Sequence, residues 1–191
     1  MSARSLCLLL VTVAACTEPP PPASRRDALS PPARAPRRLS AAQLHAAIEG
    51  ATGEVWRGPA TIVDPLSYTG TRDAPDADLL KLYAAGLGAP DFNYTVQESL
   101  EPTITFAKYA EDAVRATCTA AARKTPSTLV KVSGDDEAAR RANATALVLR
   151  FWGDVIEPSS DEVNGLLELH GQGGWAAVCV ALATHPRFLT F

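Results

Sequence analysis

The residues that could do chemistry in this chain are few, and none stands in a recognisable catalytic pattern. Among the 191 residues there are three histidines, His45, His170 and His185. None belongs to an H-E-x-x-H motif, in which two histidines one helical turn apart bind zinc. There is no G-x-S-x-G motif for a nucleophilic serine and no C-x-x-C-H motif for covalent haem. We therefore predict no catalytic residue, no metal site and no cofactor, and we interpret the histidines as surface or helix-end residues.

Three aspartates lie close together in the middle of the chain, at Asp73, Asp76 and Asp78. Carboxylates two or three residues apart can share a hard cation such as calcium. The glycine and the bidentate glutamate of an EF-hand loop are missing, however, and acidic residues are also favoured where a helix begins. We prefer a helix start at Asp78, and a calcium site stays open as the alternative.

The first 16 residues have the layout of a secretory signal. Arg4 supplies a positive charge, and the apolar run at 6–15 is too short to span a bilayer, which takes about 20 helical residues. The run ends in Val-Ala-Ala-Cys at 13–16, which resembles the lipobox of bacterial lipoprotein precursors. The resemblance implies that residues 1–15 are removed and that Cys16 carries a diacylglyceryl group and an N-acyl chain such as palmitate. The alternative is an ordinary cleaved signal, with Cys16 as the first mature residue.

The resemblance to lipoproteins also implies a location. The residue after Cys16 is Thr17 rather than aspartate, which under the sorting rule of such lipoproteins favours the outer membrane. Two or more acyl chains hold a protein firmly on a bilayer, because each buried methylene contributes about 0.8 kcal/mol. We therefore expect a lipid anchor in the bacterial cell envelope, at the outer membrane.

The next segment, residues 16–38, reads as a tether. Seven prolines and almost no large apolar side chains leave it unable to form a core. Five arginines against two acidic residues give residues 17–38 a net charge of +3, whereas residues 39–191 hold 12 Lys and Arg against 19 Asp and Glu, a net charge of −7. An acidic domain argues against nucleic acid as a partner. The division predicted is a signal peptide at 1–15, a tether at 16–38 and a domain at 39–191.

Two cysteines, Cys118 and Cys179, remain in the exported domain. In an oxidising compartment such a pair predicts one disulfide. The bridge would close a loop of about 60 residues and stabilise the domain by about 4 kcal/mol on the chain-entropy model. Two separate buried thiols are the alternative.

The pattern of the domain is mainly helical. Ser40 and Gln43 form a capping box, Pro102 precedes a long apolar stripe that includes Cys118, and Ser159 with Glu162 forms a second capping box. A glycine run at 171–174 separates the last two helices. We predict one small α domain with about six helices, at 41–50, 78–87, 103–123, 135–151, 160–169 and 175–184, and a short extended piece at 128–132.

Residues 54–75 show no helical period, which predicts a long ordered loop or a short pair of strands. Long loops in small domains are often functional. Trp56 and Tyr68 lie in this segment, and Trp152 lies at the end of an expected helix. Because large aromatic side chains are enriched at binding surfaces, these three are the candidate binding residues.

Three stretches of the domain also resemble a group of uncharacterised helical domains that accompany cytochrome-c modules in exported planctomycete and myxobacterial proteins. They are the opening at 37–44, the run at 149–153 followed by 158–163, and the closing His-Pro-x-Phe-Leu tail within 178–189. The resemblance implies an accessory helical module working beside exported partners. Electron transfer is not implied, because the haem motif is missing.

Two functions from different classes follow. The first is a non-catalytic, lipid-anchored helical module that binds an envelope protein or polymer. The second is a small periplasmic enzyme or ligand carrier whose site lies under the 54–75 loop. An enzyme would gather perturbed polar groups in a pocket, whereas a partner module would expose an apolar patch.

Overall fold

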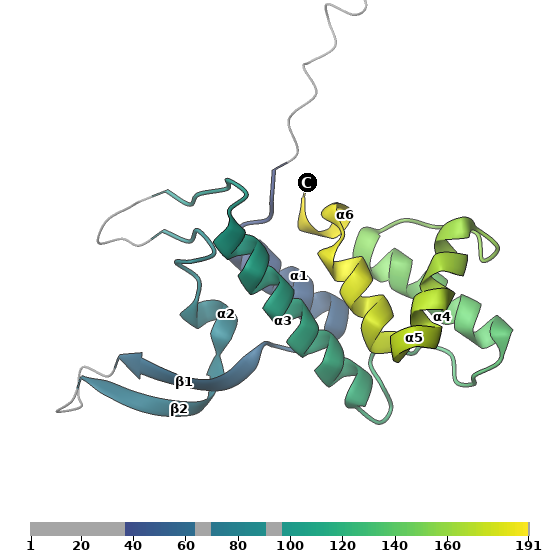
Figure 1. Cartoon of the computed structure of the whole chain (residues 1–191), viewed down its shortest axis with the longest axis horizontal. Coiled ribbons are helices and arrows are strands. Elements are labelled where there is room, and N and C mark those ends of the chain that lie inside the picture. Colours follow the sequence, from purple (N-terminus) through teal and green to yellow (C-terminus); the bar gives the residue numbers. More distant parts are fainter. Residues whose placement is uncertain (1–36, 64–69, 91–96, 191) are drawn as a thin grey trace, which may run out of the picture. The chain divides into compact units, whose positions relative to one another are not determined.

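The computed structural model describes residues 37–63, 70–90 and 97–190, so the predicted signal, Cys16, residues 17–36 and Tyr68 lie outside the described residues. Figure 1 shows helices for most of the described chain and one small hairpin. The prediction of a mainly α fold is confirmed. For residues 54–75 the sequence left a long irregular loop or a short pair of strands open, and the structure has a two-stranded antiparallel sheet that begins in this segment. The elements are α1 (Ala41–Thr52), β1 (Arg57–Val63), β2 (Thr71–Asp78), α2 (Leu79–Leu82), α3 (Ile104–Arg123), α4 (Glu137–Trp152), α5 (Asp161–Thr184) and α6 (Pro186–Leu189).

Local signals set the ends of the longer helices. Ser40 and Gln43 form the predicted reciprocal capping box at the start of α1, and Gly53 ends that helix with a positive φ of 74°. The hydroxyl of Thr103 caps α3, and the carboxylate of Asp136 caps α4. In each case a side-chain oxygen accepts a backbone N–H that has no partner within the helix.

Four predictions about the elements were wrong in detail. The helix expected at 78–87 begins at Leu79, because Asp78 completes β2 and caps α2, and it ends at Leu82 after four residues, followed by turns. Residues 128–132 form turns rather than an extended piece. The last long helix is capped by Ser160, not Ser159, and it continues to Gln172, with non-helical backbone only at the next two glycines.

The core lies where α3 and α4 pack on α5, while α1 packs on α3. Cys118 of α3 and Cys179 of α5 are both fully buried and form the predicted disulfide. The other fully buried large side chains come from all four long helices and the segments beside them: Leu44, Ile48, Leu87, Val114, Leu129, Leu147, Val148, Val163, Val178 and Leu182. The helical body therefore has one continuous apolar core, crossed by a covalent bridge.

Asn143 explains why 128–132 is not a strand. This buried amide lies on α4, where its oxygen accepts from the backbone N–H groups of Lys131 and Val132 and its nitrogen donates to the Val132 carbonyl. One side chain thus provides the hydrogen bonds that a neighbouring strand would otherwise provide. The turn is fixed to α4, and no sheet partner is needed.

Arg38 belongs to the domain rather than to the tether, one residue before the boundary that the sequence suggested. Its side chain is only 5% exposed. The guanidinium donates to the carbonyls of Leu39, Ser99 and Glu101 and lies 4.2 Å above the Phe106 ring. The backbone of Arg38 also bridges to Thr190, so the first and last described segments of the domain run side by side.

Candidate functional site

The hairpin of β1 and β2 is the most distinctive surface feature of the described chain. Its strands pair from Arg57 opposite Asp78 to Val63 opposite Thr71, with a bulge between Gly58 and Ala60 where prolines interrupt both strands. Exposure alternates along β1, so that one face is half-buried and the other is open to solvent. Figure 1 shows the hairpin extending away from α4 and α5, with α2 beside it. We call these two strands the arm.

The base of the arm is fixed to the helical body. The Leu79 N–H donates to the Trp56 carbonyl at 2.8 Å, and a Cβ on Gly58 would lie only 3.0 Å from Leu79. Trp56 is half-buried, and its ring lies 5.7 Å from that of Tyr83. Tyr83 in turn stacks on Tyr109 of α3, with centroids 4.7 Å apart and planes 6° from parallel. Trp56, a predicted binding residue, therefore anchors the arm.

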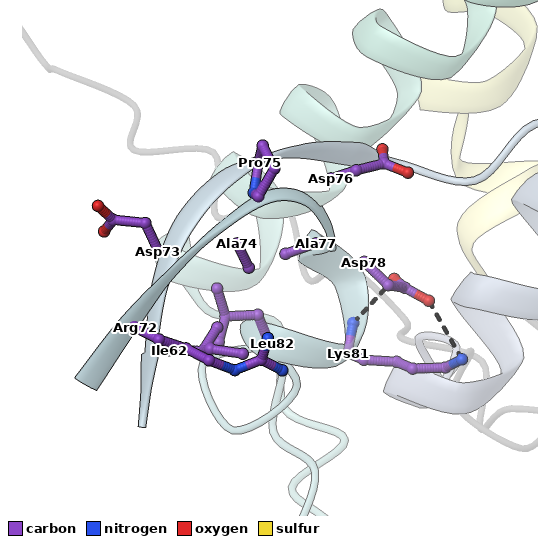
Figure 2. A pocket seen from close by; sticks show the side chains of 10 residues that line it. All are labelled: Ile62, Arg72, Asp73, Ala74, Pro75, Asp76, Ala77, Asp78, Lys81 and Leu82. Atoms are coloured by element: carbon purple, nitrogen blue, oxygen red, sulfur yellow. Dashed lines mark hydrogen bonds and ion pairs between the residues drawn. The ribbon is translucent and has the colours of Figure 1, made fainter. Parts of the chain in front are cut away.

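A hollow of about 580 Å³ opens between the arm and α2. Figure 2 shows the side chains that line it, among them Ile62 of β1 and Leu82 of α2. Successive residues of β2, from Arg72 to Asp78, line it. Because successive strand residues point to opposite faces, the lining of the hollow includes residues from both faces of β2, together with Ile62 of β1. Five of its ten lining residues, Ile62 and residues 72–75, belong to the 54–75 segment, for which a binding surface is predicted.

The three aspartates of this segment bind different partners. Asp73 accepts a hydrogen bond from the Thr61 hydroxyl at 3.0 Å, and Asp76 forms an ion pair with Arg57 at 3.2 Å. Asp78 contacts His45 and Lys81. Figure 2 shows Asp73 pointing away from Asp78. Among the residues that the structure describes, no three potential metal ligands gather at one point, so the calcium alternative finds no support there.

Asp78 is the centre of a charged network at the base of the arm. One carboxylate oxygen accepts from His45 Nε2 at 3.1 Å and from Lys81 Nζ at 3.2 Å, and the other accepts the Lys81 backbone N–H. Burial acts to raise the pKa of Asp78, but these hydrogen bonds and the charge on His45 outweigh it, so the pKa is lowered. The second ring nitrogen of His45 faces Glu49 at 3.7 Å. Both nitrogens of the imidazole are thus directed at carboxylates rather than into the hollow.

Trp152, the other described binding candidate, is engaged within the domain. Its indole N–H donates to the Leu182 carbonyl at 3.0 Å. The His185 ring lies 4.7 Å from it, and the Arg187 guanidinium lies 5.4 Å from the ring centroid. Trp152 therefore joins the end of α4 to α5 and α6. The structure does not bring Trp56 and Trp152 together, and Tyr68 lies outside the described residues.

A second apolar surface lies on the outer side of α4. Val155 is 89% exposed, Leu149 is 51% exposed and Val132 is 39% exposed. They border a groove of about 350 Å³ that also includes Ala142, Ala146 and Ile156. Nothing in the sequence distinguished this face, because apolar residues on both sides of α4 give it no single stripe.

The comparisons with known proteins add no relative. No family model, no curated protein and no solved structure matches this chain significantly. Within the described part of the chain, no helix is long and apolar enough to cross a bilayer.

Sequence reasoning pointed to the segment that supplies half of the lining of the hollow, but it did not predict the contacts at the base of the arm. The spacing of His45 and Glu49, one helical turn apart, was visible in the sequence, as was the capping role of Asp78. The sequence could not show that His45 and Asp78, which are 33 positions apart, are in contact. Leu82 was expected inside a longer helix and instead closes the hollow.

Proposed function

We propose that this chain is a lipid-anchored envelope module that binds a partner protein along the arm, in the hollow between β2 and α2. The observation that supports it is an open hollow lined by residues 72–78 of β2 and by Leu82 of α2, in a hairpin that has no third strand among the described residues. An extended segment of a partner can add to such an edge through main-chain hydrogen bonds, while pockets accept its side chains. The bulge and prolines near the base limit pairing to the outer part of β2.

The exposure pattern supports a binding surface at this place. Leu82 is 39% exposed inside the hollow, and Val63 at the far end of β1 is 82% exposed. Of these two, only Leu82 lines the hollow, next to Ile62 of β1 in the same lining; apolar side chains that line an open hollow are typical of interaction sites. The base is fixed by the aromatic stack and by Asp78, so the arm is held in one position before binding, which reduces the entropic cost of association.

The experiment is co-purification of the tagged protein from its own host, with matched variants. Leu82→Asp places a charge in the hollow, and Leu149→Asp places one in the α4 groove. We expect a stoichiometric partner with the wild type and with Leu149→Asp, and its loss with Leu82→Asp. Retention by Leu82→Asp with loss in Leu149→Asp would contradict the proposal and assign binding to α4. Circular dichroism of both variants checks that each is folded.

The lipid anchor is a separate part of the proposal. The lipobox-like sequence ending at Cys16 supports it, together with the proline-rich segment that follows. Intact-mass measurement of the mature protein should show acyl chains on a chain that begins at Cys16, and a Cys16→Ala variant should lack them. We propose the outer membrane as the location, on the basis of Thr17. A mature chain with unmodified Cys16 in the soluble fraction would contradict the proposal of a lipid anchor but would leave the proposal of a partner site unaffected.

A ligand carrier or small enzyme is the second candidate, because the hollow lies in the segment where that alternative predicted a site. Its lining combines apolar side chains with Arg72, Asp78 and Lys81, and the pKa of Asp78 is lowered. A small molecule bound in the hollow would protect the arm from proteolysis without any partner protein being present. Screening of the purified chain by thermal shift, with Leu82→Asp as the control, distinguishes this candidate from a protein partner.

A further inference from the structure

The α4 groove gathers half of the exposed large apolar side chains. Six such side chains are exposed among the described residues, and three of them, Val132, Leu149 and Val155, border this groove. Single apolar side chains on a surface need no explanation, but several around one groove are typical of an interaction surface. None of the three lines the hollow beside the arm. The α4 groove is therefore a second surface that an occupant could cover.

The groove has a floor and two walls. Its floor is the outer face of α4, formed by Ala142, Thr145, Ala146 and Leu149. At 3.6 residues per turn, Arg141 and Asn143 lie about 100° to either side of Ala142. The Asn143 amide binds the backbone of residues 131 and 132, and the Arg141 guanidinium donates to the Pro158 carbonyl at 2.8 Å. The first wall (residues 128–132) and the second wall (residues 153–158) are thus held on opposite sides of α4 at the same level.

The two walls carry opposite charges that have no partner in the described part of the chain. Lys131 is exposed on the first wall and Glu157 is exposed on the second, and neither side chain forms an ion pair with another described residue. The remaining acidic residue of the second wall, Asp154, already pairs with Arg187 at 3.0 Å. Each wall therefore combines an exposed valine with one unpaired charge, and the signs are complementary.

We propose that the α4 groove is the interface of a symmetric dimer of this chain. A two-fold axis along α4 places the first wall of each copy against the second wall of the other. Val132 then packs on Val155 of the second copy, and Lys131 pairs with Glu157 of the second copy, at two equivalent places. An axis across α4 would bring the two Lys131 side chains together, and like charges oppose association. This inference goes beyond the partner site on the arm and does not depend on it.

Disulfide trapping in cells of the native host tests this geometry. Two full-length copies with different tags are produced together, one with Val132→Cys and the other with Val155→Cys, and the cells are exposed briefly to a mild oxidant. We expect a covalent dimer that carries both tags and is lost on reduction. The matched control replaces Val155→Cys by Ile104→Cys, at a position 90% exposed on α3. Because a disulfide requires Cα atoms within about 7 Å, the control should give at least about fivefold less dimer.

A charge exchange in the same assay tests the pairing of Lys131 with Glu157. Adding Lys131→Glu to the copy with Val132→Cys should lower the yield about threefold, because repulsion replaces an exposed ion pair. Adding Glu157→Lys to the other copy as well should restore the yield, because the pair is rebuilt with its signs exchanged. This restoration requires that the two walls face each other in two copies of the same chain.

The outcomes separate the dimer from the partner site on the arm. Leu82→Asp in both copies should leave the yield unchanged, since Leu82 lies in the hollow. A yield no higher than that of the Ile104→Cys control would overturn the dimer, as would a loss with Lys131→Glu that Glu157→Lys does not restore. A different protein that co-purifies with the wild type and is lost with Val155→Asp, without any covalent dimer, would give the groove another occupant and also overturn the proposal.

Discussion

Replacing Arg38 should destabilise the domain strongly, although the sequence places this residue in a solvated arginine-rich tether. We consider Arg38→Met, because methionine keeps an apolar stem over Phe106 and removes only the guanidinium. The substitution leaves the carbonyls of Leu39, Ser99 and Glu101 without their donor. Hydrogen bonds from a charged donor contribute about 1.5–3 kcal/mol each, and a cation over an aromatic ring about 0.5–2 kcal/mol.

The net loss of stability is smaller than the sum of these contributions. Water can hydrogen-bond some of the freed carbonyls, and removing the guanidinium also removes the free-energy cost of burying its charge. That cost is visible in its pKa, which burial lowers and Glu98 partly restores. We expect Arg38→Met to reduce the free energy of unfolding by about 3 kcal/mol. Arg38→Lys should lose about half as much, because an ammonium keeps the charge without the planar fork.

Urea unfolding of the mature chain, followed by far-UV circular dichroism without reductant, measures the effect. The matched control is Arg37→Met, because Arg37 is the exposed neighbour in the same sequence. It should change stability by no more than about 0.5 kcal/mol. Equal effects of the two substitutions would refute the assignment of Arg38 to the domain.

Three other perturbations have expected outcomes. Asp78→Asn keeps a capping side chain but loses the charge, so it should cost about 0.5–1 kcal/mol at pH 7. Since the pKa of Asp78 is lowered in the fold, that stabilisation exists above the unfolded pKa of about 3.9 and is lost as the pH falls through the folded value. A series of urea midpoints from pH 7 downward should show the difference between the two proteins shrinking in acid. Replacing Cys118 and Cys179 together by alanine should cost up to about 4 kcal/mol, and reductant should shift the thermal midpoint of the wild type but not that of the variant. Asn143→Ala breaks three hydrogen bonds of a fully buried amide and should cost about 2–4 kcal/mol in urea unfolding, whereas Asn164→Ala, at an exposed position, should stay within about 0.5 kcal/mol.

The parts of the fold that followed from the sequence are those decided locally. Ser40 with Gln43 specifies the start of α1 within four residues, and the apolar stripe of α3 places Cys118 on the buried face without knowledge of its partner. The disulfide could be predicted because only two cysteines remain in the domain. Where one residue competes with its neighbour for the same role, as Ser159 does with Ser160, the sequence was less decisive.

What could not be predicted depends on contacts between distant segments. Arg38 looks like any tether arginine until Ser99 and Glu101 are placed beside it. Residues 128–132 have the composition of a strand, but the Asn143 amide binds the backbone of Lys131 and Val132. The candidate site follows the same rule. Residues 54–75 could be singled out because their sequence has no helical period, but the hollow depends on how α2 packs against β2, which the sequence does not show.

Photo-cross-linking in cells of the native host tests the proposed partner site most directly. A photoreactive amino acid is placed at Leu82 in the hollow, and in separate strains at Leu149 and at Ile104, an exposed apolar position on α3. If the arm binds a partner, position 82 should give a cross-linked product of one defined mass that the other two positions do not give. Cross-links of the same product from position 149 alone, or equal yields from all three positions, would contradict binding along the arm.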